Sequence, residues 1–243
     1  MDGRVARLEA AKKLLIEMTG SHSFLVRCRQ GTVSSDEIRL YLVQEGLYDQ
    51  YFTRYLCAMM SSLPSNEAVQ ALAGNLVREL GLAPNRPKPH HLMYREMLER
   101  CSLTLEGAEA LPATRQLIDT MFKACRDVNP ASGLGAIWLG SESLVPSIYS
   151  DIMAGLEAHG AQPEDMEFFL AQVDRAEGHA QTLYDLMAEV ASGRPDRTDR
   201  MLLVGQQLVS ARLDFFSAIE QTWERQAQAD MTLAATSGEL TLV

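Results

Sequence analysis

The chain has 243 residues, of which 47% are hydrophobic and 22% are charged, and its net charge is −10. This composition is typical of a globular protein with a full core, and the lack of a linker favours one large domain. The acidic balance argues against nucleic acid or an anionic membrane as a partner, and no apolar run approaches the roughly 20 residues that cross a bilayer. There is no signal-peptide core, and four scattered cysteines indicate reduced thiols. We therefore expect a cytoplasmic protein.

Glycines and prolines fall at intervals of a helix length, and the segments between them carry apolar residues at helical spacing. This pattern predicts helices over residues 3–18, 23–29, 35–62, 66–80, 90–101, 113–127, 131–158, 163–190 and 197–228. The proline-rich segment 82–89 is not helical, and Pro146 is expected to bend the helix that contains it. The fold class is therefore all-α: a single-domain bundle of about seven to eight helices over residues 1–230. Periodicity is lost in the tail, residues 231–243.

Catalytic options in such a bundle are few, because the sequence has no Gly-rich phosphate loop, nucleophile elbow or HExxH motif. Bundles do build metal sites from inward-facing Glu and His on separate helices. Side chains of these two types in contexts unusual for a surface are Glu45, Glu79, His90, His91, Glu142 and His179. Glu142 lies between Ile137–Gly140 and Leu144, where a buried carboxylate needs a cation, a metal or a proton.

Carboxylate and imidazole ligands suit iron, manganese or zinc, and iron(II) with open positions can bind dioxygen beside a substrate. The competing interpretation is that each Glu is simply solvated on a helix surface. A single histidine such as His22 or His159 is more often a surface or capping residue.

Five segments, in this order, resemble the haem-oxygenase-like helical superfamily of TenA thiaminases, PqqC-type oxidases and di-iron oxygenases. They are SHSFLVRCRQGTVSSDEIRLYLVQEGLYDQYFTRYL (21–56), NLVRELG (75–81), HHLMYREML (90–98), GSESLVPSIYSDIMAGLEAHG (140–160) and FFLAQVDRAEGHAQTL (168–183). The resemblance covers residues 20–226. It implies the haem-oxygenase-like fold, a homodimer, iron(II) as cofactor and dioxygen as co-substrate.

The resemblance to the di-iron members implies a set of metal ligands. They fall on Glu79, His90 (with His91 as the alternative), Glu142 and His179. Two further ligand positions fall on Gln172 and Ala176, which share a helix face with His179 within roughly 60° of arc. Alanine cannot bind a metal and glutamine is a weak ligand, so one iron, or a second held weakly, is implied. A π-bulge that turns Asp174 or Glu177 inward would restore the second set.

Departures from the other branches narrow the function. The segment GLGAIWLGSE lacks the cysteine that the thiaminases carry there, although Glu45 stands where they have an aspartate. Ser141 replaces the tyrosine that precedes the fourth-helix Glu in the para-aminobenzoate-forming branch. His22 lies near the position of the proximal histidine of haem oxygenase, but no apolar cleft wide enough for haem is indicated.

Around the metal ligands, Glu45 and Tyr48 share a helix face with Phe52, and Tyr149 follows Glu142 by two turns. Arg175 precedes His179 by one turn and suits a substrate carboxylate. Core packing for the tyrosines and a surface ion pair for Arg175 are the competing interpretations.

We therefore expect a non-haem iron-dependent oxidase or oxygenase that activates dioxygen to oxidise a small substrate derived from an amino acid, amine or fatty acid in specialised metabolism. Two alternatives stay open. One is a metal-free enzyme of the same fold, either a PqqC-like oxidase or a TenA-like aminopyrimidine hydrolase with Glu45 as its acid/base group. The other is a non-catalytic binding or scaffold protein that has lost the family's chemistry.

Overall fold

The computed structural model describes residues 3–84, 88–192 and 194–239, except for the side chains of residues 174–180 and 233–239. The helices are α1 (Gly3–Gly20), α2 (Ser23–Arg29), α3 (Ser35–Asp49), α4 (Phe52–Met60), α5 (Asn66–Glu79), α6 (His90–Arg100), α7 (Pro112–Cys125), α8 (Pro130–Leu134), a π-helix η1 (Gly135–Glu142), α9 (Val145–Ala158), a 3-10 turn η2 (Pro163–Met166), α10 (Glu167–Ala191) and α11 (Pro195–Glu239). The described residues contain no strand. The all-α prediction is confirmed, with more helices than the seven to eight expected.

Local sequence explains where several helices begin. The Ser34 hydroxyl accepts a hydrogen bond from the Glu37 amide at 3.0 Å and caps α3. Ser65 caps α5 in the same way, through the Ala68 amide. Such side-chain acceptors satisfy amides that have no partner within the helix. Prolines open α7, α8 and α11, where a missing amide costs nothing.

The long helices expected over 35–62, 131–158 and 163–190 are each interrupted. Between α3 and α4 the chain turns at Gln50 and Tyr51, so that Glu45 and Phe52 lie on different helices. The bend expected near Pro146 is present, and a π-helix precedes it. The 3-10 turn η2 precedes α10. The last helix runs on to Glu239 through the segment where lost periodicity led us to expect an irregular tail.

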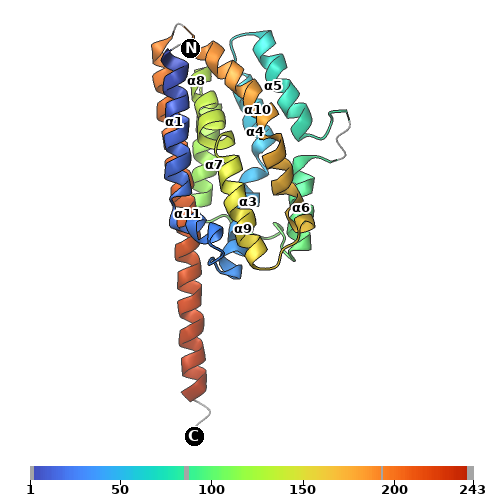
Figure 1. Ribbon diagram of the computed structural model, residues 1–243, viewed down its shortest axis with the longest axis vertical. Coiled ribbons are helices and arrows are strands. Elements are labelled where there is room, and N and C mark those ends of the chain that lie inside the picture. Colours follow the sequence, from blue (N-terminus) through green and yellow to red (C-terminus); the bar gives the residue numbers. More distant parts are fainter. Residues whose placement is uncertain (1–2, 85–87, 193, 240–243) are drawn as a thin grey trace.

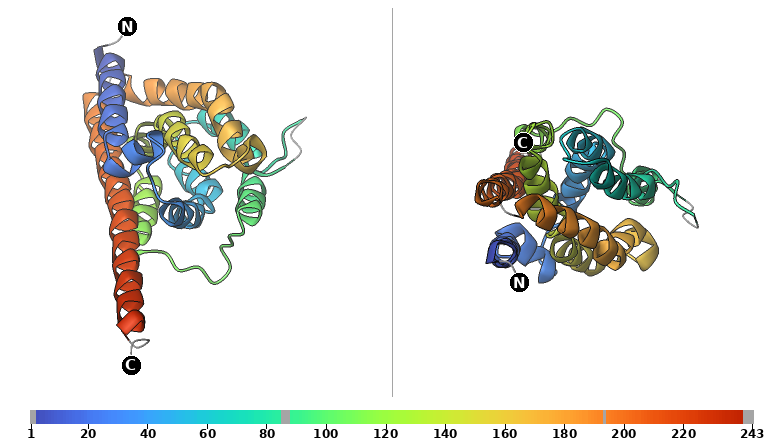
Figure 2. Two further views of the ribbon diagram at one scale, coloured as in Figure 1. Left: turned by 60° about the horizontal axis from the view of Figure 1, so that its bottom comes forward. Right: turned by 90° about the horizontal axis from the view of Figure 1, so that it is seen from above.

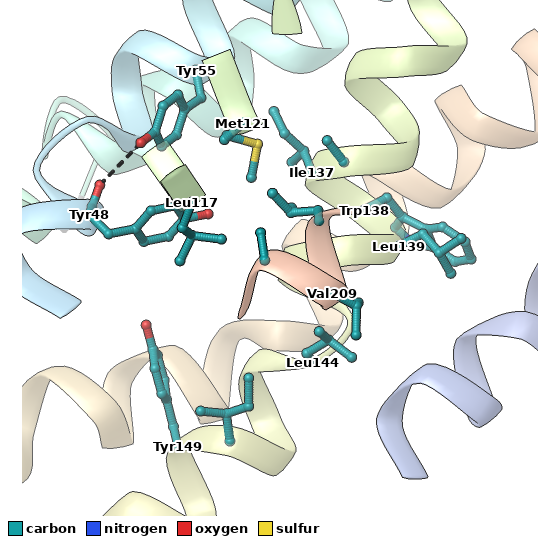
Figure 3. Close-up of a cluster of buried hydrophobic side chains, with 14 of the residues drawn as sticks. Tyr48, Tyr55, Leu117, Met121, Ile137, Trp138, Leu139, Leu144, Tyr149 and Val209 are labelled. Carbon is teal, nitrogen blue, oxygen red and sulfur yellow. Dashed lines mark hydrogen bonds between the residues drawn. The ribbon is translucent and has the colours of Figure 1, made fainter. Parts of the chain in front are cut away.

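Helix α11 lies along one edge of the bundle, beside α1 (Figures 1 and 2), and its buried face packs against the core residues of η1. Figure 3 shows Ile137, Trp138 and Leu139 of η1 beside Val209 of α11. Glycine permits this close approach, because a Cβ at Gly135 would lie 2.5 Å from the Met201 carbonyl oxygen. Buried rings extend the core on both sides, since Tyr149 packs against Phe169 with centroids 4.8 Å apart.

Helix α11 is the longest element, and its C-terminal part extends well past the rest of the bundle (Figure 1). Within the described part of the chain, no helix is long and apolar enough to cross a membrane.

Candidate functional site

A narrow cavity inside the bundle brings several of the expected residues together. It is lined by Glu45, Tyr48 and Asp49 of α3, Phe52 of α4, Gly140–Glu142 of η1, Leu144, Val145, Ile148 and Tyr149 at α9, Gln172 of α10 and Arg212 of α11. Its volume is about 30 Å³. Figure 3 shows the Tyr149 hydroxyl pointing from α9 toward the side of the core where Tyr48 lies. Thus Glu45, Tyr48, Glu142, Tyr149 and Gln172 share one cavity.

Glu79 and His90 form a buried pair at one end of this region. The Glu79 Oε2 and His90 Nδ1 atoms lie 2.6 Å apart, and the residues are 4% and 3% exposed. Gly81 makes the meeting of α5 and α6 possible. Its φ of +69° is one that glycine adopts freely, and a Cβ there would lie 2.6 Å from the Pro89 nitrogen. The turn at Gly81 therefore allows Glu79 to contact His90, which lies eleven positions later in the chain.

Gln172 also contacts this pair. Its side-chain Nε2 atom lies 3.1 Å from His90 Nδ1. The amide thus stands beside the imidazole, at the position where the resemblance implies a metal ligand. A glutamine there binds a metal only weakly.

Other carboxyl groups lie close to Glu142. Burial, followed by repulsion from Glu79, raises the pKa of the Glu142 carboxyl to about 8. Asp49 lies in the same cluster, and burial together with Glu45, Glu79 and Glu142 raises its pKa well above the ordinary value. Carboxylates in this environment hold a proton unless a cation is close. Asp49 is a site residue that our sequence analysis missed.

Arg212 is a second residue that our sequence analysis missed. It is 5% exposed and forms a buried ion pair with Glu45. Its guanidinium also lies over the Tyr48 ring, 4.4 Å from the centroid. The Glu45 side chain is therefore engaged in a buried ion pair, which disfavours a role as a free acid/base group.

The two tyrosines of the cavity are neutral phenols. Burial raises the pKa of Tyr48 and of Tyr149 above the ordinary value. The Tyr48 hydroxyl is buried and lies beside the Ser141 side chain. Each phenol can donate a hydrogen bond without supplying a negative charge.

The remaining expected residues divide into two groups. His91 is exposed and lines a separate outer pocket, so the structure does not support it as the alternative to His90. The side chains of Asp174, Arg175, Glu177 and His179 lie outside the described residues. Without them, no three His, Cys, Asp or Glu side chains of the described part stand close enough to hold a metal ion.

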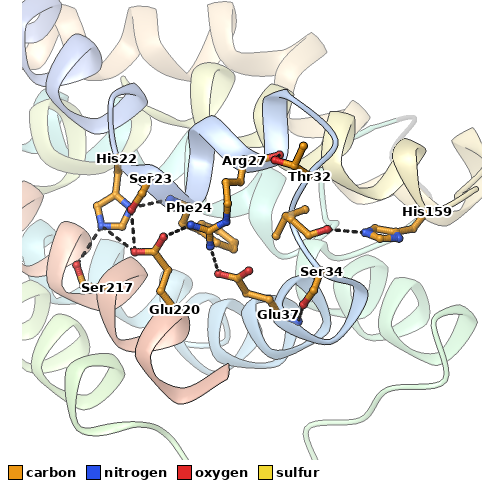
Figure 4. A network of polar contacts seen from close by, with 11 residues as sticks. His22, Ser23, Phe24, Arg27, Thr32, Ser34, Glu37, His159, Ser217 and Glu220 are labelled. Atoms are coloured by element: carbon orange, nitrogen blue, oxygen red, sulfur yellow. Dashed lines mark hydrogen bonds and ion pairs between the residues drawn. The ribbon is translucent and has the colours of Figure 1, made fainter. Parts of the chain in front are cut away.

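His22 has a structural role in this fold. Its Nδ1 atom accepts a hydrogen bond from the Phe24 amide at 3.2 Å and caps α2, and its Nε2 atom lies 3.0 Å from the Ser217 hydroxyl (Figure 4). The same network joins Arg27 to Glu37 and Glu220. Both ring nitrogens are engaged, so His22 is not available as a haem ligand.

The donor types near Glu142 fit iron(II). One imidazole and carboxylates are the ligands that non-haem iron sites use, and a metal would offset the repulsion between Glu79 and Glu142. A complete set needs at least one donor beyond the Glu79–His90 pair and Glu142, which is the place expected for His179.

Comparisons with known proteins identify the family to which the chain belongs. A family model described as iron-containing redox enzyme matches residues 39–212. The 4-aminobenzoate synthase of Chlamydia trachomatis is 25% identical over 202 residues, which cover 81% of this chain and 84% of that protein.

Solved structures show the same fold. A domain of unknown function with a heme oxygenase-like fold from Shewanella denitrificans has a TM-score of 0.76 at 16% identity, over 90% of this chain and 93% of its own. A CADD-like protein of unknown function from Nostoc punctiforme has a TM-score of 0.73 at 17% identity, over 89% and 98%. A TenA homolog from Pseudomonas syringae has a TM-score of 0.69 at 12% identity, over 90% and 91%.

Proposed function

This chain belongs to the family of iron-containing redox enzymes, and we propose that it is a non-haem iron-dependent oxidase or oxygenase. Its substrate would be a small molecule derived from an amino acid, amine or fatty acid in specialised metabolism, oxidised with dioxygen. One observation carries the proposal: Glu79 and His90 form a buried pair, and burial together with repulsion from Glu79 raises the pKa of the Glu142 carboxyl to about 8.

The residues that would hold iron are Glu79, His90, Glu142 and His179. Bound there, iron(II) would supply open coordination positions at which dioxygen can be activated beside a substrate. Because Gln172 and Ala176 stand at the other ligand positions, we propose one iron, or a second held weakly. The amide of Gln172 beside His90 helps to fix the orientation of the imidazole.

We propose that the lining of the cavity faces the reacting end of a substrate and limits water. Phe52, Leu144 and Ile148 form an apolar wall, and the narrow volume leaves little space for solvent. We propose that the neutral Tyr48 and Tyr149 hydroxyls donate hydrogen bonds to oxygen atoms in the cavity. Arg175 remains a proposed contact for a substrate carboxylate.

Other functions of the fold receive less support. A TenA-like hydrolase would need Glu45 as its acid/base group, but Arg212 pairs with it. The name of the Chlamydia protein suggests synthesis of 4-aminobenzoate. This chain has Ser141 in place of the tyrosine of that branch, which disfavours the same reaction here. A non-catalytic scaffold would gain nothing from placing the carboxyl groups of Asp49 and Glu142 close enough to repel each other.

Oxygen consumption tests the proposed function. Protein loaded anaerobically with iron(II) is mixed with oxygenated buffer and a panel of amino acids, amines and fatty acids. We expect at least one substrate to accelerate oxygen uptake, and Glu142→Ala to abolish this acceleration while Glu157→Ala, an exposed control on α9, retains it. Acceleration by iron-free, chelator-treated protein would contradict the proposal.

We also propose that the protein is a cytoplasmic homodimer. Light scattering of the purified chain, and fractionation of cells that express it, check these two statements. A monomer, or recovery in the membrane fraction, would contradict them.

A further inference from the structure

A second pocket opens to the surface next to the inner cavity. Its volume is about 580 Å³, and it is lined by Gly46, Asp49, Gln50, Arg54, His91, Tyr94, Arg95, Thr104, Leu105 and Glu106. Asp49 lines the inner cavity as well. Its side chain therefore stands at the junction of a narrow inner space and an outer space large enough for a small molecule.

Asp49 has the properties of a receptor for a positively charged group. Among the described residues its carboxylate makes no ion pair or hydrogen bond, whereas Glu45, one helical turn away, is paired with Arg212. Burial and the carboxylates around it raise its pKa, and Arg212, a described cation that acts on it, is already paired with Glu45. An ammonium group at this junction would supply a compensating charge through a charge-assisted hydrogen bond.

The outer pocket, in contrast to Asp49, offers positively charged side chains. Arg54 and Arg95 line it, and neither forms an ion pair with a described carboxylate. Arg54 packs over the Tyr51 ring at 5.1 Å from the centroid, which orients its guanidinium. Glu106 is the other acidic residue of the lining. On a chain with a net charge of −10, two exposed arginines in the lining of one pocket favour an anionic group.

We infer that the outer pocket and Asp49 together bind a zwitterionic substrate, with its ammonium group at Asp49 and its carboxylate at Arg54 and Arg95. The amine-bearing end then lies nearest the carboxylate cluster of the inner cavity, and the carboxylate end faces the outer pocket. This inference rests on the proposed function in one respect, because it takes the inner cavity as the place of reaction. Of the amino-acid, amine and fatty-acid substrates proposed above, it selects the amino acids.

Ligand binding to iron-free protein tests the inference independently of any redox chemistry. Two sets of probes separate the contributions of the charges. L-leucine is compared with 3-methylbutylamine and 4-methylpentanoate, and 6-aminohexanoate with pentylamine and hexanoate. We expect at least one zwitterion to bind about tenfold more tightly than both of its singly charged counterparts, measured by titration calorimetry.

Variants assign each charge to its residue. Asp49→Asn is expected to weaken the zwitterion and the amine about tenfold and to leave the acid unchanged. The double variant Arg54→Gln/Arg95→Gln should weaken the zwitterion and the acid but not the amine. Asp119→Asn and Arg115→Gln, exposed on α7, are the matched controls and should change nothing. Circular dichroism checks that each variant is folded.

Three results would overturn the inference. The first is that neither zwitterion binds more tightly than its counterparts at millimolar concentration. The second is that Asp49→Asn behaves like Asp119→Asn. The third is that Asp49→Asn loses bound iron, since Asp49 would then be a metal ligand. Failure of iron loading in the unsubstituted protein would contradict the proposed function and leave these binding results standing.

Discussion

At the scale of single residues, Glu142 makes the stability of the iron-free protein depend on pH. Its folded pKa is about 8, against an ordinary value of 4.5, so between these values the folded state keeps a proton that the unfolded state has lost. Stability must therefore fall as the pH rises through this window. We expect Glu142→Gln to flatten the fall and to stabilise the iron-free protein at about pH 8. Urea unfolding at several pH values measures this.

The control for this experiment is Glu157→Gln, which removes an exposed carboxylate from α9 and should keep the pH dependence of the unsubstituted protein. The same fall with pH in Glu142→Gln would contradict the environment described for Glu142.

The buried pair of Arg212 and Glu45 gives a second prediction. Arg212→Met leaves a carboxylate buried without its cation, which costs about 3–5 kcal/mol of unfolding free energy. Adding Glu45→Gln removes the uncompensated charge, so the double variant should recover at least half of that loss. Urea unfolding at neutral pH gives the three values. A double variant as unstable as the sum of both single variants would show that the two side chains do not interact.

The sequence indicated Glu79, His90 and Glu142 because each stands in a segment whose wording resembles the family. Arg212 gave no such signal, since a charged residue in SARLDFF is indistinguishable from one on a solvated helix face. Asp49 was accessible to sequence reasoning. It follows Glu45 by four residues, so it belongs to the face already assigned to Glu45 and Phe52. The sequence could not show that Arg212 of α11 forms an ion pair with Glu45 and not with Asp49.

At the scale of elements, hydrophobic periodicity located most helices within a few residues, and α2 falls on the predicted range. It could not show the break at Gln50 and Tyr51, because neither residue is a proline or glycine and Tyr51 continues the apolar pattern. Nor could it show that Gly135–Glu142 is a π-helix. That conformation depends on packing against α11, which lies far away in the sequence.

Close packing of η1 on α11 leads to a prediction for its glycines. Gly135→Ala would place a methyl group 2.5 Å from the Met201 carbonyl oxygen, a backbone atom that cannot move aside cheaply. We expect a loss of about 2 kcal/mol in unfolding free energy. Gly74→Ala, in α5, is the matched control, since its nearest contact would be Arg78 at 3.9 Å. It should stabilise the protein by about 0.5–1 kcal/mol. Equal effects in urea unfolding would contradict the packing described.

At the scale of the whole molecule, the projecting part of α11 contributes little to the bundle. Most of residues 221–232 are exposed, and Met231 is 73% exposed. We expect deletion of residues 226–243 to change the unfolding free energy by less than about 1 kcal/mol. Iron binding should also be unchanged, because the pairing of Arg212 with Glu45 is retained. A large loss of either would show that this segment supports the site.

The central claim is that Glu79, His90 and Glu142, with His179, hold iron. Metal analysis after anaerobic loading with iron(II) and removal of free metal tests it most directly. We predict at least one iron per chain in the unsubstituted protein and in His91→Ala, and none in His90→Ala or Glu142→Ala. An iron-free unsubstituted protein, or full iron content in His90→Ala and Glu142→Ala, would contradict the account.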